Sequence, residues 1–381
     1  MPLNKLGDIS VEDFLAHYWQ KQPLLIRQAY PDFQSPIDGN DLAGLSLEED
    51  AEARLILEHG TTPWELRHGP FDENTYQQLP KSHWTLLVQA VDQWVPDVRD
   101  LLDDFRFIPN WRLDDIMVSY AADQGSVGPH FDYYDVFLLQ GQGKRRWQVG
   151  QSCDSQSPRI EGAALRILKD FEPEHDWILE PGDMLYLPPG IAHWGTAQGD
   201  DCLTYSIGFR APSHADILCE LAQDIASHLT EDQRYGDPGL TLGRHPGEIP
   251  ASAIDTIRAQ LLDYLSHDRI GDWLGRYMTE RKYPDQDQPE QYVDAEHWQE
   301  DRWQPHPATR LASRTVNTQT WLYADGERFA CTEALAERLC QMRPIEGREL
   351  AALASSEALI TLVETLIERG ILVDEEDELE C

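Results

Sequence analysis

The chain has 381 residues, more than one domain usually holds, so two or three compact units are expected. Its 31 Lys and Arg residues stand against 68 Asp and Glu residues, and the formal net charge of −37 disfavours binding to a phosphate backbone. No apolar run approaches the roughly 18 residues of a membrane-spanning helix, and the first residues do not read as a signal peptide, so a cytoplasmic protein without a membrane partner is expected. Two explanations of the acidity stay open: complementarity to a basic partner, or adaptation of the surface to high salt.

The N-terminal part is predicted to place helices beside a sheet. Ser10 stands three residues before Asp13 in an N-cap pattern, so a helix is expected to begin there, and Pro23 then turns the chain into the strand-like run LLIR. A second helix is predicted for HWTLLVQAVDQW, where one stripe holds Trp84, Leu87, Val88, Val91 and Trp94.

From about residue 112 to residue 210 the chain alternates short apolar runs with Gly and Pro. The runs are IMVSYA, HFDYYDVFLLQ, KRRWQV, MLYL and TYSIGF. Repeated short strands separated by turn signals indicate a small barrel or sandwich.

Beyond Pro212 the pattern returns to helix. The segments HADILCELAQDIASHL and ASAIDTIRAQLLDYL carry apolar residues at three- and four-residue steps, which predicts two amphipathic helices that pack on each other or on a second subunit. Residues 284–308, rich in Pro and acidic side chains, are interpreted as a linker.

The last segment, residues 309–381, is predicted to be a small winged-helix-like module. It holds a hairpin with an Asp325-Gly326 turn, helices around ALAERLC, ELAALA and ALITLVETLIER, and a stop at Gly370 before a closing strand. Because the sequence is mixed to acidic and ends in DEEDELEC, a protein-interaction or dimer-supporting role is favoured, and direct DNA binding is not expected.

A candidate metal centre is carried by His130-Phe131-Asp132. On a strand, residues two apart point the same way, so His130 and Asp132 are expected to face one side together. His214-Ala215-Asp216 has the same spacing, but it opens a predicted helix, where such residues diverge. The Gly- and Pro-rich approach GSVGP before His130 and the strand signal after it distinguish the first pair from the second.

The third ligand is expected from LEPGDMLYLPPGIAHW, in which a turn, a strand and a rigid Pro188-Pro189-Gly190 loop deliver His193. Two His and one carboxylate on one face of the metal, with the remaining positions open, are typical of Fe(II) oxygenases. The sequence therefore predicts an iron site formed by His130, Asp132 and His193, with no catalytic acid or base needed beyond the metal centre.

The segments GPHFDYYDVFLLQGQGKRRW, LEPGDMLYLPPGIAHW and YSIGFRAP resemble the JmjC-type cupin-fold ribosomal oxygenases, and among them the bacterial ribosomal protein arginine hydroxylases. The resemblance extends over nearly the full length. It implies an α+β multidomain protein whose catalytic domain, a double-stranded β-helix with flanking helices, covers residues 1–212. A helical dimerisation domain is then expected over 213–283, a linker over 284–308, and a winged-helix domain over 309–381.

The resemblance also implies an activity. Members use Fe(II), 2-oxoglutarate and O2, and the bacterial members hydroxylate an arginine of large-subunit ribosomal protein sixteen, so the expected partners are a basic ribosomal protein and a second copy of the chain. His130, Asp132 and His193 fall on the family's iron-ligand positions.

The distal carboxylate of 2-oxoglutarate needs a cation, and strand alternation selects one among three neighbours. Arg145 shares the face of the apolar Trp147 and Val149, whereas Lys144 and Arg146 share the opposite face. Arg145 is therefore predicted to point inward. The resemblance implies the same residue, with Ser119 as its hydroxyl partner.

The same parity argument suggests a pocket for the substrate arginine. The expected contacts are Asp115 to the guanidinium, Met117 and Tyr134 on either side of the methylenes, and Ser206 as a hydrogen-bond partner. The resemblance makes these positions plausible substrate contacts, and ordinary barrel packing stays open for each of them.

Several other functions compete with this one. One alternative is a histidine hydroxylase that acts on another ribosomal protein. An acid in the substrate pocket, such as Asp115, suits the guanidinium of an arginine better than a neutral imidazole. A non-oxygenase cupin binding protein or sugar isomerase would favour H-x-H with an added Glu over H-x-D. A demethylase lacks support because the sequence shows no aromatic cage, and a winged-helix transcription factor is disfavoured by the acidity.

Overall fold

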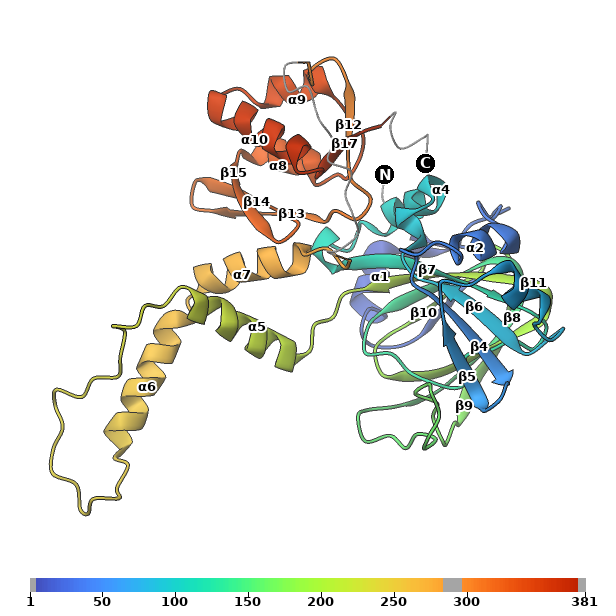
Figure 1. The fold of residues 1–381 in the computed structure, drawn as a ribbon, viewed down its shortest axis with the longest axis horizontal. Coiled ribbons are helices and arrows are strands. Elements are labelled where there is room, and N and C mark those ends of the chain that lie inside the picture. Colours follow the sequence, from blue (N-terminus) through green and yellow to red (C-terminus); the bar gives the residue numbers. More distant parts are fainter. Residues whose placement is uncertain (1–4, 284–296, 376–381) are drawn as a thin grey trace. The chain divides into compact units, whose positions relative to one another are not determined.

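The protein is described by a computed structural model in which residues 5–283 and 297–375 are placed (Figure 1). The chain divides into two compact units, Met1–Ala211 and Pro212–Cys381. Along the chain, the boundary lies directly after the last strand of the first unit, near the predicted end of the catalytic domain. Each unit has its own apolar core, so each is described by itself.

The described part of the first unit is built from antiparallel strands with short helices at the flank. The strands are β1 (Lys5–Leu6), β2 (Ile9–Ser10), β3 (Leu24–Ile26), β4 (Ala53–His59), β5 (Pro63–His68), β6 (Trp84–Val88), β7 (Leu113–Ala121), β8 (Val136–Ser152), β9 (Pro173–Leu179), β10 (Met184–Leu187) and β11 (Ile191–Phe209). The α-helices are α1 (Val11–His17), α2 (Gly39–Leu45), α3 (Glu73–Gln77) and α4 (Pro96–Arg99), and short 3-10 helices cover Val91–Gln93, Asp100–Phe105 and Asn110–Arg112.

The main sheet has the strand order β3-β10-β8-β11-β7-β6-β4-β5, with β9 paired to β8. The two longest strands, β8 and β11, pair with each other over most of their length. The first part of β8 also pairs with β10, and its last part pairs with β9. This is the JmjC cupin fold that the resemblance implied.

The core confirms the alternation expected for these strands. Phe137 and Leu139 of β8 pack in the large cluster with Phe14 of α1, whereas Val136 and Leu138 pack in a second cluster on the opposite face. Both faces of β8 are therefore buried. Figure 1 shows α1 beside the strands.

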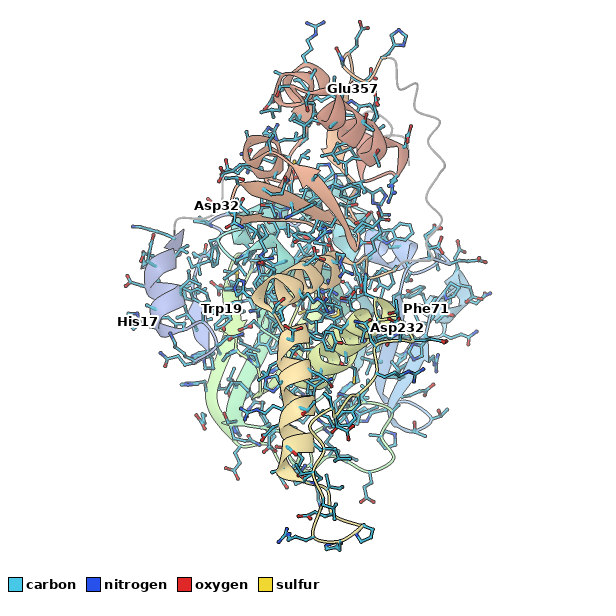
Figure 2. All side chains as sticks on the ribbon, turned by 90° about the vertical axis from the view of Figure 1, so that its left-hand side faces the viewer. His17, Trp19, Asp32, Phe71, Asp232 and Glu357 are labelled. Atoms are coloured by element: carbon cyan, nitrogen blue, oxygen red, sulfur yellow. The ribbon has the colours of Figure 1, made fainter. Side chains whose placement is uncertain are left out.

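The predicted N-cap at Ser10 is confirmed, whereas the prediction of a second helix over HWTLLVQAVDQW is wrong. The Ser10 side chain accepts a hydrogen bond from the Asp13 amide, and α1 ends at His17, labelled in Figure 2. Within HWTLLVQAVDQW, Trp84–Val88 instead form β6, which pairs with β4 on one side and β7 on the other, and Val91–Gln93 form a short 3-10 helix. A strand that is buried on both faces carries a continuous apolar run, and such a run fits helical spacing as well as strand spacing.

The second unit contains three helices followed by a small α/β module. Its described elements are α5 (His214–Ser227), α6 (Ala251–Tyr264), α7 (His267–Thr279), β12 (Arg302–Pro305), β13 (Leu311–Val316), β14 (Gln319–Ala324), β15 (Glu327–Cys331), α8 (Glu333–Leu339), β16 (Ile345–Glu346), α9 (Gly347–Leu353), α10 (Glu357–Glu368) and β17 (Leu372–Asp374). The predicted Asp325-Gly326 turn joins β14 to β15, with both residues at positive φ, as a two-residue hairpin requires.

The segment interpreted as a linker is partly structured. Residues 284–296 of that segment lie outside the described residues. Further on, β12 pairs with β16 and β17, and Trp298 and Trp303 are buried in the core of the second unit. Burial of two indole rings binds residues 297–308 to the winged-helix module despite their polar composition.

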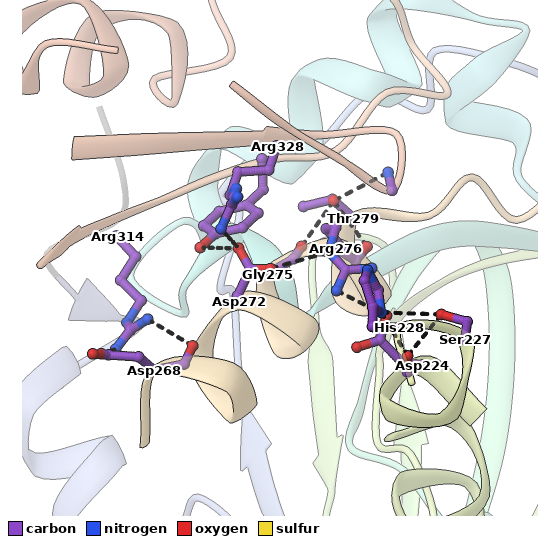
Figure 3. Close-up of polar contacts among 12 residues, drawn as sticks. Asp224, Ser227, His228, Asp268, Asp272, Gly275, Arg276, Thr279, Arg314 and Arg328 are labelled. Carbon is purple, nitrogen blue, oxygen red and sulfur yellow. Dashed lines mark hydrogen bonds and ion pairs between the residues drawn. The ribbon is translucent and has the colours of Figure 1, made fainter. Parts of the chain in front are cut away.

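Ion pairs join α7 to three other elements, β15, β13 and α5 (Figure 3). Asp272 accepts a hydrogen bond from Arg328 of β15 at 2.7 Å, and Asp268 accepts one from Arg314 of β13 at 2.8 Å. Arg276 lies 2.9 Å from Asp224 of α5. The helix α6 differs, because none of its residues is buried.

Among the described residues, no helix is both long enough and apolar enough to cross a membrane.

The predicted turn at Pro181-Gly182-Asp183 is held by one buried carboxylate. Asp183 accepts hydrogen bonds from the amides of Gln28 and Glu180 at 2.9 and 3.0 Å, and from Arg27 at 2.6 Å. Burial raises the pKa of the Asp183 carboxyl, but these donors outweigh it and lower the pKa below its usual value. The turn sets the start of β10, and β10 leads to the loop before His193.

Replacing Asp183 by Asn is expected to lower the free energy of unfolding by about 1–3 kcal/mol near pH 7, because three donors lose a charged acceptor. A carboxyl with a lowered pKa in the folded state stabilises the fold above its ordinary pKa of about 4, and this contribution is lost as the pH falls through the lowered value. Urea unfolding at pH 7 and pH 3 should show the difference at pH 7 and a smaller one at pH 3. The exposed Asp8→Asn is the control, and an equal effect of Asp183→Asn at both pH values would contradict the assignment.

Candidate metal centre

The centre is built on two histidines that are paired through their backbones. His193 lies on β11, and His130 precedes β8. The amide of His130 donates to the carbonyl of His193 at 3.0 Å, and the amide of His193 donates to the carbonyl of His130 at 2.8 Å. This isolated bridge brings the two ring centroids to 4.2 Å.

Both imidazole rings are oriented by a carbonyl two residues earlier in the chain. Nδ1 of His130 lies 2.9 Å from the carbonyl of Gly128, and Nδ1 of His193 lies 2.9 Å from the carbonyl of Ile191. Because a carbonyl can only accept, each Nδ1 carries the proton and each Nε2 presents a lone pair. An outer hydrogen bond of this kind is typical of metal-binding histidines.

Asp132 completes the cluster. Its Oδ2 lies 3.6 Å from Nε2 of His193 and 4.0 Å from Nε2 of His130. The three ligand atoms all lie within 4.8 Å of one another, which is close enough to hold one metal ion. Two imidazole nitrogens and one carboxylate form the facial donor set of non-haem Fe(II).

The environment of His193 favours the neutral form of its imidazole, which can bind a metal. Burial and, to a smaller extent, the nearby His130 lower the pKa of His193 to about 4, although Asp132 and the hydrogen bond to the Ile191 carbonyl oppose the shift. His193 is therefore neutral at physiological pH, which is the form that coordinates a metal.

The predicted strand through His130 and Asp132 is wrong, although the three side chains do meet. β8 begins only at Val136, and residues 131–135 form a loop. The amide of Gly190 donates to the carbonyl of Asp132 at 2.8 Å, so the Pro-Pro-Gly loop holds Asp132 in place. Gly190 has φ +79°, a backbone conformation that favours glycine.

Arg145 points inward, as the alternation predicted. It is only 4% exposed, and its Nη1 donates to Ser119 Oγ at 3.0 Å and to Thr204 Oγ1 at 3.2 Å. Its guanidinium lies 5.5 Å from the ring of Trp147, and that ring lies 5.9 Å from the ring of His193. Arg145 therefore shares the interior of the barrel with the candidate metal ligands.

The neighbouring cations point away from the barrel. Lys144 lies 2.6 Å from Glu180, and Arg146 pairs with Asp176, with about half of each side chain exposed. Both cations already have acidic partners at the surface.

The Arg145 site fits a carboxylate ligand. Within residues 5–283 and 297–375, no acidic side chain pairs with Arg145. Its Nε and the indole Nε1 of Trp147 are buried without a hydrogen-bond partner. A buried cation whose described partners are neutral hydroxyls is costly unless an anion joins it, and the carboxylate of a dicarboxylic acid would supply that anion.

The predicted substrate contacts occupy different environments. Asp115 is 2% exposed, and its carboxylate oxygens Oδ2 and Oδ1 accept from the side-chain Nε2 of Gln89 at 2.9 and 3.2 Å. Met117 and Ser206 lie opposite each other on β7 and β11. Tyr134 lies in the loop after Asp132 and is 43% exposed. Their roles toward a substrate stay predictions.

Three polar residues of this region were missed by the sequence analysis. Thr204 stands two residues before Ser206 on the same strand, so the parity that selected Ser206 would also have found it. Gln89 and Arg54 had no such signal, because Gln89 directly follows β6, which was taken for a helix, and Arg54 lies on β4, a strand that the sequence analysis did not predict. Arg54 Nη2 donates to Gln89 Oε1 at 3.0 Å and lies 3.7 Å from the sulfur of Met117.

The second H-x-D sequence serves another purpose, as expected. His214 begins α5, and Asp216 forms a capping box with Ser213. The Asp216 carboxylate therefore stabilises a helix start.

Comparison with known proteins agrees with this geometry. Residues 100–217 match the JmjC domain family, and residues 257–373 match the ROXA-like winged helix. The chain is 35% identical to the ribosomal protein uL16 3-hydroxylase of Escherichia coli, over 71% of this chain and 72% of the relative. It is 39% identical to a probable ribosomal oxygenase of Haemophilus influenzae, over 70% of this chain and 67% of the relative.

The fold has a close counterpart among solved structures. The structure of YcfD, a ribosomal oxygenase from Escherichia coli in complex with cobalt and 2-oxoglutarate, superposes with a TM-score of 0.85 at 29% identity. The match covers 97% of this chain and 99% of the other. The paired histidines, the inward arginine, and the two family matches agree with these relatives: the chain belongs to the JmjC-domain ribosomal oxygenase family.

Proposed function

We propose that this protein is an Fe(II)- and 2-oxoglutarate-dependent oxygenase that hydroxylates an arginine side chain of uL16, large-subunit ribosomal protein sixteen. The observation that carries the proposal is the cluster of His130, Asp132 and His193 beside a buried Arg145, in a chain 35% identical to a uL16 3-hydroxylase. Such a substrate would be met in the cytoplasm.

Nε2 of His130, the Asp132 carboxylate and Nε2 of His193 would hold the iron. Bound iron, with 2-oxoglutarate and O2, supplies the oxidant that converts a C–H bond to a C–OH group. The protein's own residues bind and orient the reactants and keep water out. The hydrogen bonds from both Nδ1 atoms fix the two rings, so the ligands need little rearrangement when the metal binds.

Arg145 would bind the distal carboxylate of 2-oxoglutarate. Ser119 and Thr204 hold its Nη1, so the guanidinium is fixed before the ligand arrives. Thr204 is itself oriented, because its hydroxyl donates to Gln140 Oε1 at 3.1 Å. A preorganised cation in a buried site gives a charge-assisted contact of about 1.5–3 kcal/mol.

Asp115 supports an arginine substrate. Its carboxylate is buried and held by Gln89, which fits the recognition of a guanidinium, with Met117, Tyr134 and Ser206 as further proposed contacts. The net charge of −37 complements a basic ribosomal protein.

Incubation of the full chain with Fe(II), 2-oxoglutarate and uL16 is expected to add one oxygen to an arginine, as peptide mass spectrometry would detect. Asp132→Ala should abolish the product, because the anionic iron ligand is lost. Asp114→Ala alters a neighbouring acid outside the proposed roles and serves as the control. Addition of the oxygen to a histidine, or unchanged turnover by Asp132→Ala, would refute the proposal.

Arg145→Gln is expected to raise the KM for 2-oxoglutarate by about 10- to 150-fold, which corresponds to the loss of a charged contact of about 1.5–3 kcal/mol. Arg145→Lys keeps the charge and should recover part of the affinity. Arg146→Gln removes the adjacent, outward cation and should leave the KM unchanged. A KM for 2-oxoglutarate that does not respond to Arg145→Gln would contradict its role.

The helical segment 213–283 is proposed to support a homodimer. On α6, the apolar side chains of Ile254, Ile257 and Leu261 are 49–60% exposed and fall on one stripe. A helix with an apolar stripe and no buried residue needs a partner surface, and a second copy of the chain can supply one by symmetry.

Leu261→Glu is expected to shift the protein from dimer to monomer in sedimentation velocity, because it would place a charge in the apolar interface between the two copies of α6. Gln260→Glu adds the same charge on another side of α6 and should leave the dimer intact. A wild-type monomer, or equal behaviour of the two variants, would count against dimerisation through α6.

A further inference from the structure

A second cluster of metal-binding side chains lies at the end of β4. Glu58 and His59 are the last residues of β4, and His83 directly precedes β6. The amide of Glu58 donates to the carbonyl of His83 at 3.0 Å, which continues the pairing of the two strands. One ligand atom from each of the three side chains lies within 4.8 Å of the other two.

The two imidazoles are in contact and one of them is oriented. The rings of His59 and His83 have centroids 4.8 Å apart. Ser82 Oγ lies 2.8 Å from Nδ1 of His83, which leaves Nε2 to meet a ligand. The amide of His83 donates to the carbonyl of Asp123 at 2.9 Å, so the backbone of this residue is fixed as well.

Glu58 is the acidic member of the cluster. Within the described parts of the chain, its carboxylate forms no hydrogen bond or ion pair, although the residue is partly buried. A carboxylate without another partner in the described residues therefore lies beside two imidazoles where β4 ends and β6 begins.

We propose that Glu58, His59 and His83 bind a transition-metal dication of the zinc type. Imidazole nitrogens suit zinc, copper and nickel, whereas magnesium and calcium prefer sites made of oxygen atoms. Three protein ligands leave a coordination position for water. The cluster uses β4 and the segment before β6, and it shares no residue with His130, Asp132 and His193.

A metal at this position would act as a clamp on the fold. It would join the end of β4 to the start of β6, and the backbone contact of His83 would extend the link to Asp123 in the connection between β7 and His130. An ion that binds the folded but not the unfolded chain stabilises the fold, so zinc should raise the thermal unfolding midpoint.

The test uses the full chain with the other metal centre removed by Asp132→Ala and His193→Ala. Zinc titration by calorimetry should give one bound ion in this background. Adding His83→Asn should weaken zinc binding by at least about tenfold, the lower limit for losing even an outer partner of a metal site. Asn suits position 83 because His83 has φ +65°, which Asn tolerates well.

Two further variants separate metal binding from folding. His59→Ala removes an exposed ring whose ring contact is with His83, and it should weaken zinc binding to the same extent. The exposed His68→Ala, on the neighbouring strand β5, should leave zinc binding and the zinc-induced rise in unfolding temperature unchanged. A background protein that binds no zinc, or whose binding survives both His59→Ala and His83→Asn, would overturn the proposal. The result is independent of hydroxylation, because the background lacks the iron ligands.

Discussion

The long antiparallel pairing of β8 with β11 is the constraint on which the catalytic unit depends. Its register sets which side chains face the barrel interior, and side chains along a strand alternate with a period of two. A slip by one residue would turn Arg145 and Trp147 outward and bring Lys144 and Arg146 into an apolar core. The same pairing carries His193 to its position beside Trp147.

The barrel keeps two charges of opposite sign in separate environments. Arg145 is a buried cation held by hydroxyl groups, and Asp115 is a buried anion held by the amide of Gln89. Neither charge is paired with the other in the described contacts. This separation suits two ligands of opposite charge, a dicarboxylate on one side and a guanidinium on the other.

The sequence predicted which side chains lie close together better than it predicted the elements that carry them. Local rules were sufficient for the Ser10 N-cap, the Asp325-Gly326 turn and the inward direction of Arg145, because each depends on a few adjacent residues. His130 and Asp132 were placed correctly on a wrong premise, since a loop held by Gly190 aligns them. β6 was mistaken for a helix because its partners, β4 and β7, are distant in sequence, and Gln89, which directly follows β6, was missed with it.

The bridge between His130 and His193 is made of main-chain atoms alone. The two hydrogen bonds that close this end of the barrel therefore do not depend on which side chains stand at positions 130 and 193. Substitution at these two positions can change the metal-ligand set while the backbone that positions the ligands is retained. During evolution, the fold can therefore be kept while the side chains that carry out the chemistry change. This is how one barrel fold can host unrelated reactions.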